Sequence, residues 1–214
     1  MATTAAIAFQ AQADTSITAT LVSDYVYNGV SSTDGRPTLQ ASADWWSDAG
    51  VYAGVWGSGV NFNDGSNTRV ELDYYVGYAG SINDSLGYDV GYAFYTYPGA
   101  ADAGAEFDYG ELYGSVTYNE ATTAKLYLSE EYFGNAGKSV LLELSHSLDL
   151  GNDFSLTLAA SQTSLLDEEG DAYFGPDAGD DSYNHWGASI AKSVGGVDLN
   201  LGACRAWPIV ARAF

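Results

Sequence analysis

The chain is poor in cysteine and basic residues, and each shortage narrows what the protein can be. Its one cysteine, Cys204, excludes an internal disulfide, so cysteine does not report the compartment. Seven Lys and Arg stand against 28 Asp and Glu, for a formal net charge of -21 over 214 residues. Phosphate binding needs a basic surface, so we expect no nucleic acid among the partners. No run of roughly 18 apolar residues occurs, which excludes a membrane-spanning helix.

The sequence also lacks the motifs of cofactor and metal sites. It contains no Cys/His zinc spacing, no phosphate-binding glycine loop and no dinucleotide fingerprint. The acidic segment 163–182 lacks the alternate spacing of an EF-hand loop, which favours a solvated loop. Weak divalent-ion binding there, beside anionic lipopolysaccharide, stays open. We therefore expect no cofactor and no metal.

What the chain does have is an apolar pattern of period two, beginning with Ile17, Ala19 and Leu21. Each restart of the pattern predicts a strand with one apolar and one polar face. The predicted strands, about twelve in number, cover approximately 15–27, 38–45, 51–55, 69–78, 86–95, 109–118, 124–128, 140–148, 154–160, 186–190, 197–201 and 208–214.

The links between these strands alternate in length. Long links cover 28–36, 61–68, 98–106, 129–138 and 163–182, and short links cover 47–50, 79–84, 119–122, 149–152 and 193–196. Outer-membrane barrels have short turns at one end and long loops at the other. The pattern predicts an all-β fold, a transmembrane antiparallel up-and-down β-barrel whose even strand number leaves no free edge. A soluble secreted β-sandwich acting as a binding module stays open as an alternative, although it does not explain the rhythm of the links.

Aromatic residues near strand ends favour the membrane interpretation. Tyr25, Tyr27, Trp45 and Trp186 stand where an interfacial girdle is expected. Phe214 gives the aromatic C-terminus of outer-membrane barrels, so we expect the outer-membrane barrel assembly machinery as a partner, together with membrane lipid and lipopolysaccharide.

The two ends of the chain depart from this pattern. Ala11-Gln12-Ala13 has the small-x-small form of a secretory cleavage site, so 1–13 is interpreted as a residual or truncated signal peptide and 14–214 as the barrel. The last predicted strand, 208–214, is atypical. It contains Pro208, which cannot donate to a ladder, and it places Arg212 on the same face as Phe214.

Several segments resemble the TorF-type porins, a proteobacterial family of conserved outer-membrane proteins of unknown function. The resemblance rests on 24–37 (DYVYNGVSSTDGRP), 50–58 (GVYAGVWGS), 71–78 (ELDYYVGY), 88–91 (YDVG) and 97–99 (YPG). It covers roughly residues 14–200 and implies a barrel in the outer membrane of a Gram-negative bacterium. No substrate and no binding residues come with it.

If the apolar rows face lipid, the opposite rows line a lumen that is rich in acids. The predicted pore-lining acids are Asp24, Asp44, Glu71, Asp73, Asp89, Glu111, Glu143 and Asp198, and the bases are Arg69 and Lys125. Excess carboxylate favours cations, so we expect passive ion transport, or diffusion of small solutes, through a narrow cation-preferring pore. The inward tyrosines Tyr75, Tyr95, Tyr109, Tyr113 and Tyr127 could instead offer stacking surfaces to a sugar-like solute. A filled interior with hydrogen-bonded carboxylates, and hence a closed structural barrel, is the alternative.

An enzyme is not expected. His146 falls on the lipid-facing row between Leu144 and Leu148. His185 lies beside Asn184 and Ser182, a local group, whereas catalytic sets converge from several elements.

Overall fold

The computed structural model describes residues 2–11, 15–63, 67–100, 107–167 and 182–207, with the backbone alone described over 2–11 and at 207. The long strands are β1 (Ala2–Ala11), β2 (Thr15–Val22), β5 (Thr38–Trp46), β6 (Val51–Gly59), β7 (Val70–Asn83), β8 (Leu86–Thr96), β9 (Tyr109–Tyr118), β10 (Thr122–Ser129), β11 (Ser139–Gly151), β12 (Phe154–Leu165), β13 (Ser182–Val194) and β14 (Val197–Trp207). Two short strands, β3 (Val26–Tyr27) and β4 (Val30–Ser31), pair with each other as a separate hairpin. Over the described ranges, no helix is long and apolar enough to cross a membrane.

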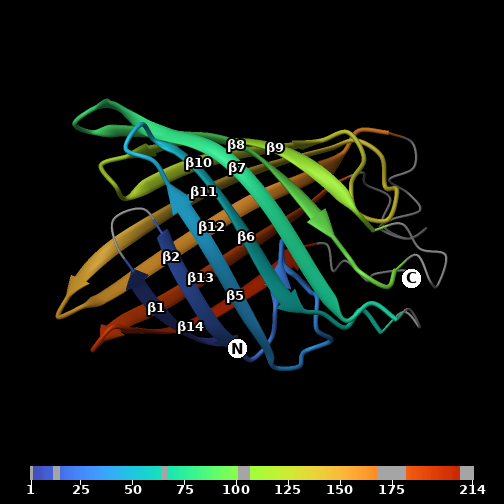
Figure 1. Cartoon of the computed structure of the whole chain (residues 1–214), viewed down its shortest axis with the longest axis horizontal. Helices are drawn as coiled ribbons and strands as arrows, with labels where there is room; N and C mark the ends of the chain where they lie inside the picture. The colour runs from blue at the N-terminus through green and yellow to red at the C-terminus, as the bar shows by residue number, and fades with distance from the viewer. Residues whose placement is uncertain (1, 12–14, 64–66, 101–106, 168–181, 208–214) are drawn as a thin grey trace.

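The twelve long strands of the described residues close into one antiparallel barrel (Figure 1). Each strand pairs with the strands before and after it in the ring, and β1 completes the ring between β14 and β2. The predicted up-and-down barrel of about twelve strands is confirmed. The sandwich alternative is wrong for this chain, because a sandwich needs two separate sheets and these strands form a single closed one.

The outer face of the barrel carries the apolar rows that the sequence predicts. Leu39 is 62 % exposed, Leu142 is 55 % exposed and Leu144 is 56 % exposed. Leu142 pairs with Leu126 on the neighbouring strand, so the rows of adjacent strands join into a continuous band. Trp45 and Trp186 are also exposed on this face. Such a band would be costly in water and matches the hydrocarbon layer of a bilayer.

The connections follow the predicted rhythm of short and long. Short turns join β5 to β6, β7 to β8, β9 to β10, β11 to β12 and β13 to β14, and they gather at one end of the barrel (Figure 1). In one of them Asn152 and Asp153 both have positive φ, at 53° and 63°, as a two-residue hairpin turn with the twist of its strands requires. The described parts of the long links therefore lie at the opposite end of the barrel.

The first predicted strand, 15–27, ends earlier than expected. β2 stops at Val22, and the chain then turns inward and forms the β3–β4 hairpin. Asp24 Oδ1 accepts hydrogen bonds from the hydroxyls of Ser31 (2.6 Å) and Thr33 (2.8 Å). The amide N–H of Tyr25 donates to Thr33 Oγ1 at 3.0 Å. These local side-chain bonds offer the backbone an alternative to the barrel ladder.

The placement of Tyr25 and Tyr27 in the lipid girdle is consequently wrong. Both side chains lie inside the barrel, where they hydrogen bond to carboxylates of the wall. Trp45 and Trp186 are exposed on the outer face, and their place in a girdle stays a prediction.

The closing strand is a further difference from the sequence analysis. The structure closes the ring with 2–11, whose Ala5 pairs with Leu199 on one side and Leu21 on the other. The predicted closing strand, 208–214, lies outside the described residues. The interpretation of 1–13 as a signal peptide stays a prediction.

Candidate functional site

The β3–β4 hairpin crosses the lumen and contacts opposite walls. On one side the hydroxyl of Tyr25 donates to Glu71 Oε1 at 3.3 Å, and that of Tyr27 donates to Glu111 Oε2 at 3.3 Å. On the other side Gly29, at the tip, lies so close to β13 and β14 that a Cβ added there would stand 2.8 Å from His185 Cβ. The hairpin thereby links β7 and β9 to β13 and β14 through the interior of the barrel.

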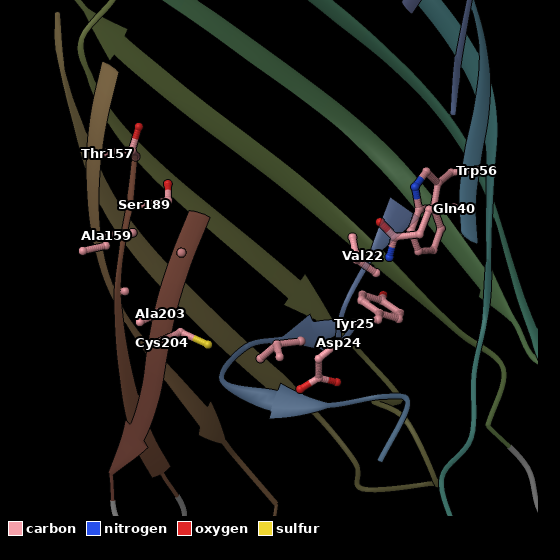
Figure 2. Close-up of a pocket in the computed structure, with 14 residues that line it drawn as sticks. Val22, Asp24, Tyr25, Gln40, Trp56, Thr157, Ala159, Ser189, Ala203 and Cys204 are labelled. Atoms are coloured by element: carbon pink, nitrogen blue, oxygen red, sulfur yellow. The ribbon is translucent and has the colours of Figure 1, made fainter. Parts of the chain in front are cut away.

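Beside the hairpin lies a cavity of about 550 Å³ (Figure 2). One wall is built from small residues of β12, β13 and β14. Thr157 pairs with Ser189, which pairs with Gly202, and in the next row Ala159 pairs with Gly187, which pairs with Cys204. The opposite side carries larger side chains, which are Val22, Tyr25, Gln40 and Trp56, with Asp24 between the two sides. Small residues on one wall are what leave this space open.

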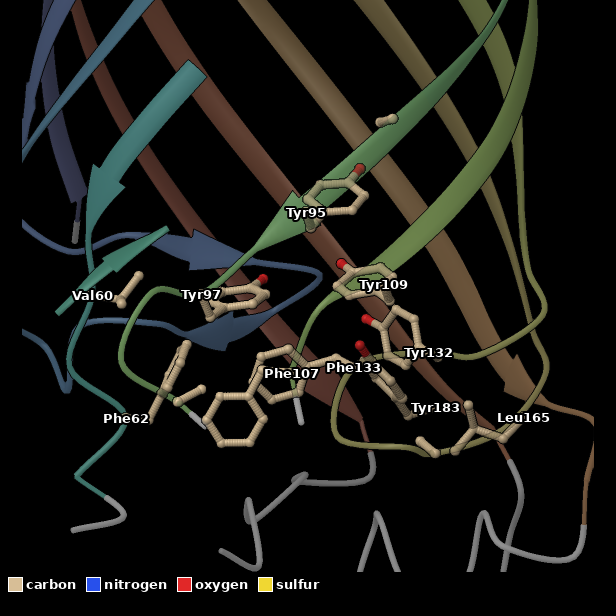
Figure 3. Close-up of a cluster of buried hydrophobic side chains, with 13 residues drawn as sticks. Val60, Phe62, Tyr95, Tyr97, Phe107, Tyr109, Tyr132, Phe133, Leu165 and Tyr183 are labelled. Carbon is tan, nitrogen blue, oxygen red and sulfur yellow. The ribbon is translucent and has the colours of Figure 1, made fainter. Parts of the chain in front are cut away.

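The end of the lumen near the long links is filled by aromatic rings (Figure 3). Phe133 stacks on Phe107 at a centroid distance of 4.6 Å and meets Tyr97 edge-on at 5.1 Å. Tyr109 stacks on Tyr95 at 4.5 Å. The space left among these rings is about 20 Å³, which is about the size of one water molecule. The cluster is therefore the narrow part of the lumen.

Three buried carboxylates stand at this level. Glu71, Asp73 and Glu111 are 3 %, 8 % and 1 % exposed, although none of them lies in a hydrophobic row. Glu71 Oε1 accepts a second hydrogen bond from the hydroxyl of Tyr97 at 2.9 Å. Burial raises the pKa of Tyr97 well above its ordinary value, so the phenol stays protonated and serves as a donor. Asp73 Oδ1 is buried and accepts no hydrogen bond from any described residue.

A second set of acids lies nearer the short turns. Asp89 Oδ1 accepts from the hydroxyl of Tyr52 at 2.6 Å, and that hydroxyl also lies 2.5 Å from the hydroxyl of Tyr113. The hydroxyl of Tyr75 donates to Asp44. The ammonium of Lys125 lies over the ring of Tyr113, 5.0 Å from its centroid. Tyrosine hydroxyls thus hold the acids of this wall in place.

Three inner tyrosines, Tyr52, Tyr75 and Tyr113, each cover a glycine of a neighbouring strand. A Cβ at Gly77 would stand 2.3 Å from the phenol of Tyr52, and one at Gly54 would stand 2.5 Å from that of Tyr75. This arrangement removes the rings from the middle of the lumen. The hairpin, the loop aromatics and the stacked pair of Tyr95 and Tyr109 fill the interior.

The structure places nearly all of the predicted lining residues on the inner side. The residues that are buried or half-buried, as an inner position requires, are Asp24, Asp44, Glu71, Asp73, Asp89, Glu111, Lys125, Glu143, Tyr75, Tyr95, Tyr109, Tyr113 and Tyr127. Arg69 differs, because it is exposed just before β7, where its Nη1 donates to the carbonyl oxygen of Thr68 at 2.8 Å. Asp198 is exposed beyond the short-turn end, where Ser193 donates to it. Whether any of these residues sets selectivity stays a prediction.

The aromatic residues of the long links were not among the predicted lining residues. Phe62, Tyr97, Phe107, Tyr132 and Phe133 all lie in links rather than in strands. The available signal was their position, since each stands within a few residues of a strand end in links that are otherwise polar. Such residues have no periodic pattern, so the alternation that predicts strands could not identify them.

The two histidines have different settings. His146 is exposed on the outer face, with its Nδ1 2.8 Å from Thr122 Oγ1. His185 is half-buried inside, and both of its ring nitrogens lie within 2.8 Å of Ser161 Oγ. His185 therefore contacts Ser161 of the neighbouring strand, which the sequence group of Ser182, Asn184 and His185 did not indicate.

A family model described as "Bacterial protein of unknown function (Gcw_chp)" matches residues 8–204. The chain belongs to this family. The match agrees with a bacterial family of uncharacterised members, and the TorF-type name stays a prediction. No curated protein matches the chain.

Solved structures similar to this chain include outer-membrane proteins of Pseudomonas aeruginosa. The protein OprD shares 12 % identity over 97 % of this chain and 69 % of its own, with a TM-score of 0.42. OccD3 (OpdP) shares 11 % identity over 94 % of this chain with a TM-score of 0.46, and the chain spans 62 % of its length. At these scores the likeness carries no argument about the lumen, and the description of the barrel rests on the strand pairing of the chain itself.

Proposed function

We propose that this family member is an outer-membrane channel for passive diffusion of small solutes and ions, with a preference for cations. The observation that carries the proposal is the group of Glu71, Asp73 and Glu111, buried together at the narrow level of the lumen. Ionised carboxylates in a constriction focus a negative potential, which raises the local concentration of cations. Lys125, farther from the long links, is engaged with tyrosine rings.

The outer membrane is the proposed location because the apolar band suits lipid and the lumen is polar. Membrane lipid, lipopolysaccharide and the outer-membrane barrel assembly machinery are the proposed partners. We propose no catalytic function. Among the described residues the imidazole of His185 contacts the hydroxyl of Ser161, and no acid or amide hydrogen bonds to it as the orienting group of a catalytic set would. Esterase or phospholipase activity that is lost in His185→Ala would contradict this.

The test is the reversal potential in a potassium chloride gradient across a planar bilayer. The protein is first shown to be folded by its faster migration when it is not boiled. We expect potassium to be preferred over chloride, and Glu111→Gln to lower the permeability ratio at least about threefold, or ~0.6 kcal/mol. Glu120→Gln is the matched control, because Glu120 is exposed in a short turn and its loss leaves the constriction unchanged. Anion preference, or equal effects of the two changes, would contradict the proposal.

A closed structural barrel is the second candidate, and the aromatic cluster is the observation that favours it. The rings around Phe133 leave a space of only about 20 Å³. A folded barrel that carries no current under any voltage would support this candidate and reject the channel.

A further inference from the structure

The cavity beside the hairpin adjoins the acidic constriction, since Tyr25 lines both. It is lined by Asp24, Tyr25, Gln40 and Trp56 on one side and by the small residues of β12 to β14 on the other (Figure 2). Its lining contains neither Glu71, Asp73 nor Glu111. A volume of about 550 Å³ lies within the usual range for small-molecule pockets, roughly 300–1,000 Å³.

The charge of the cavity has one sign. Asp24 is the charged residue among the described residues that line it, and no Lys, Arg or His is among them. Asp24 Oδ1 already accepts hydrogen bonds from Ser31 and Thr33, which fix the carboxylate beside the cavity. The cavity therefore favours a cationic over an anionic ligand.

The aromatic residues add a second preference. The rings of Tyr25 and Trp56 meet edge-on, with centroids 5.4 Å apart. Aromatic rings attract a cation with weak hydration, and tryptophan is the strongest such partner. Most of the remaining lining, such as Val22, Ala159 and Gly187, has no polar side chain. A strongly hydrated metal ion would gain little there, whereas an alkylated ammonium could bury its methyl groups.

We propose that this cavity binds a small organic ammonium, with the cationic head between Asp24 and the Tyr25–Trp56 pair and the apolar part against the β12–β14 wall. The site deepens the proposed channel function by naming the class of solute, and it rests on that function because the solute must enter the lumen.

The test uses choline as the probe and 3,3-dimethylbutan-1-ol as its neutral isostere. The whole folded chain is titrated by calorimetry in a polyoxyethylene detergent, which has no choline headgroup and no sugar. We expect choline to bind, and the isostere to bind at least about tenfold more weakly because it lacks the charge. Glucose is titrated as a polyol control.

Two variants separate the site from the fold. Trp56→Leu should weaken choline binding about tenfold, whereas Trp45→Leu, on the outer face, should leave it unchanged. Asp24→Asn retains an oxygen acceptor for Ser31 and Thr33, so the hairpin keeps its bonds while the charge is lost. Heat-modifiable migration confirms that each variant is folded.

Cys204 supplies an independent readout, because it is the one cysteine of the chain and it lines the cavity. Choline should slow the modification of Cys204 by a cationic methanethiosulfonate, and the isostere should not. Equal binding of choline and its isostere, or a preference for glucose, would overturn the site. An affinity for choline that neither Trp56→Leu nor Asp24→Asn changes would also overturn it. Choline binding without any current would overturn the proposed channel and keep the proposed site. Current without choline binding would overturn the site and keep the channel.

Discussion

The contact of the hairpin tip with the far wall can be broken by a single methyl group. Gly29 has φ +78°, and a Cβ there would lie 2.8 Å from His185 Cβ and 3.0 Å from Ala206 Cβ. Both neighbours are β-carbons that move only with their backbones, so Gly29→Ala forces the hairpin away from β13 and β14. The matched control is Gly35→Ala, because Gly35 has φ +70° and nothing lies within 4 Å of its added Cβ.

The expected loss of hairpin docking follows from the difference between positions 29 and 35. Both variants bear the cost of a left-handed alanine, about 1–2 kcal/mol. Only Gly29→Ala adds an overpacking cost, about 1–3 kcal/mol. If that cost falls on docking of the hairpin, the ratio of docked to undocked hairpin drops about 5- to 150-fold relative to the control.

The assay is the rate at which a small thiol reagent modifies Cys204, measured together with bilayer conductance. Cys204 lies two residues before Ala206 on β14 and lines the cavity beside the hairpin. Gly29→Ala should increase both quantities and Gly35→Ala should increase neither. Identical behaviour of the two variants would refute the view that the hairpin docks on this wall.

Two further predictions concern the faces of the barrel. Leu142→Arg should lower the stability of the barrel in lipid vesicles by about 2–4 kcal/mol, because Leu142 is 55 % exposed on the outer face. Ser145→Arg, on the inner face, should cost much less. Equal urea midpoints of the two variants would contradict this. Gly77→Ala should lower the stability of the barrel by about 1–3 kcal/mol, because its Cβ would stand 2.3 Å from the Tyr52 phenol. Gly114→Ala should be tolerated, because the nearest atom to a Cβ at Gly114 is 3.7 Å away. The same urea titration would show whether the two variants differ in stability.

The barrel could be predicted from the sequence because its signals are local. The two faces of a strand such as β11 can be told apart from its own sequence, since Leu142 and Leu144 point outward and Glu143 points inward. The placement of Glu71 and Glu111 inside the lumen follows from the same alternation. Neither inference needs knowledge of which strands meet.

The filling of the lumen could not be predicted because it depends on contacts between distant segments. Tyr25 and Tyr27 continue the alternation of β2, and only the bonds of Asp24 to Ser31 and Thr33 show that the chain turns inward. Their partners, Glu71 and Glu111, lie 46 and 84 positions away in the sequence. A period-two pattern carries no information about such pairs.

The distribution of side-chain size around the ring explains how one lumen holds both a constriction and a cavity. Strands β7 to β9 contribute tyrosines and carboxylates, and β12 to β14 contribute small residues such as Ala159, Gly187 and Gly202. The hairpin hydrogen bonds to the first group and, among the described residues, packs against the second at its tip. Since the bonds of Tyr25 and Tyr27 hold the hairpin to β7 and β9, any opening of the lumen should begin at the tip, where Gly29 packs against His185 and Ala206.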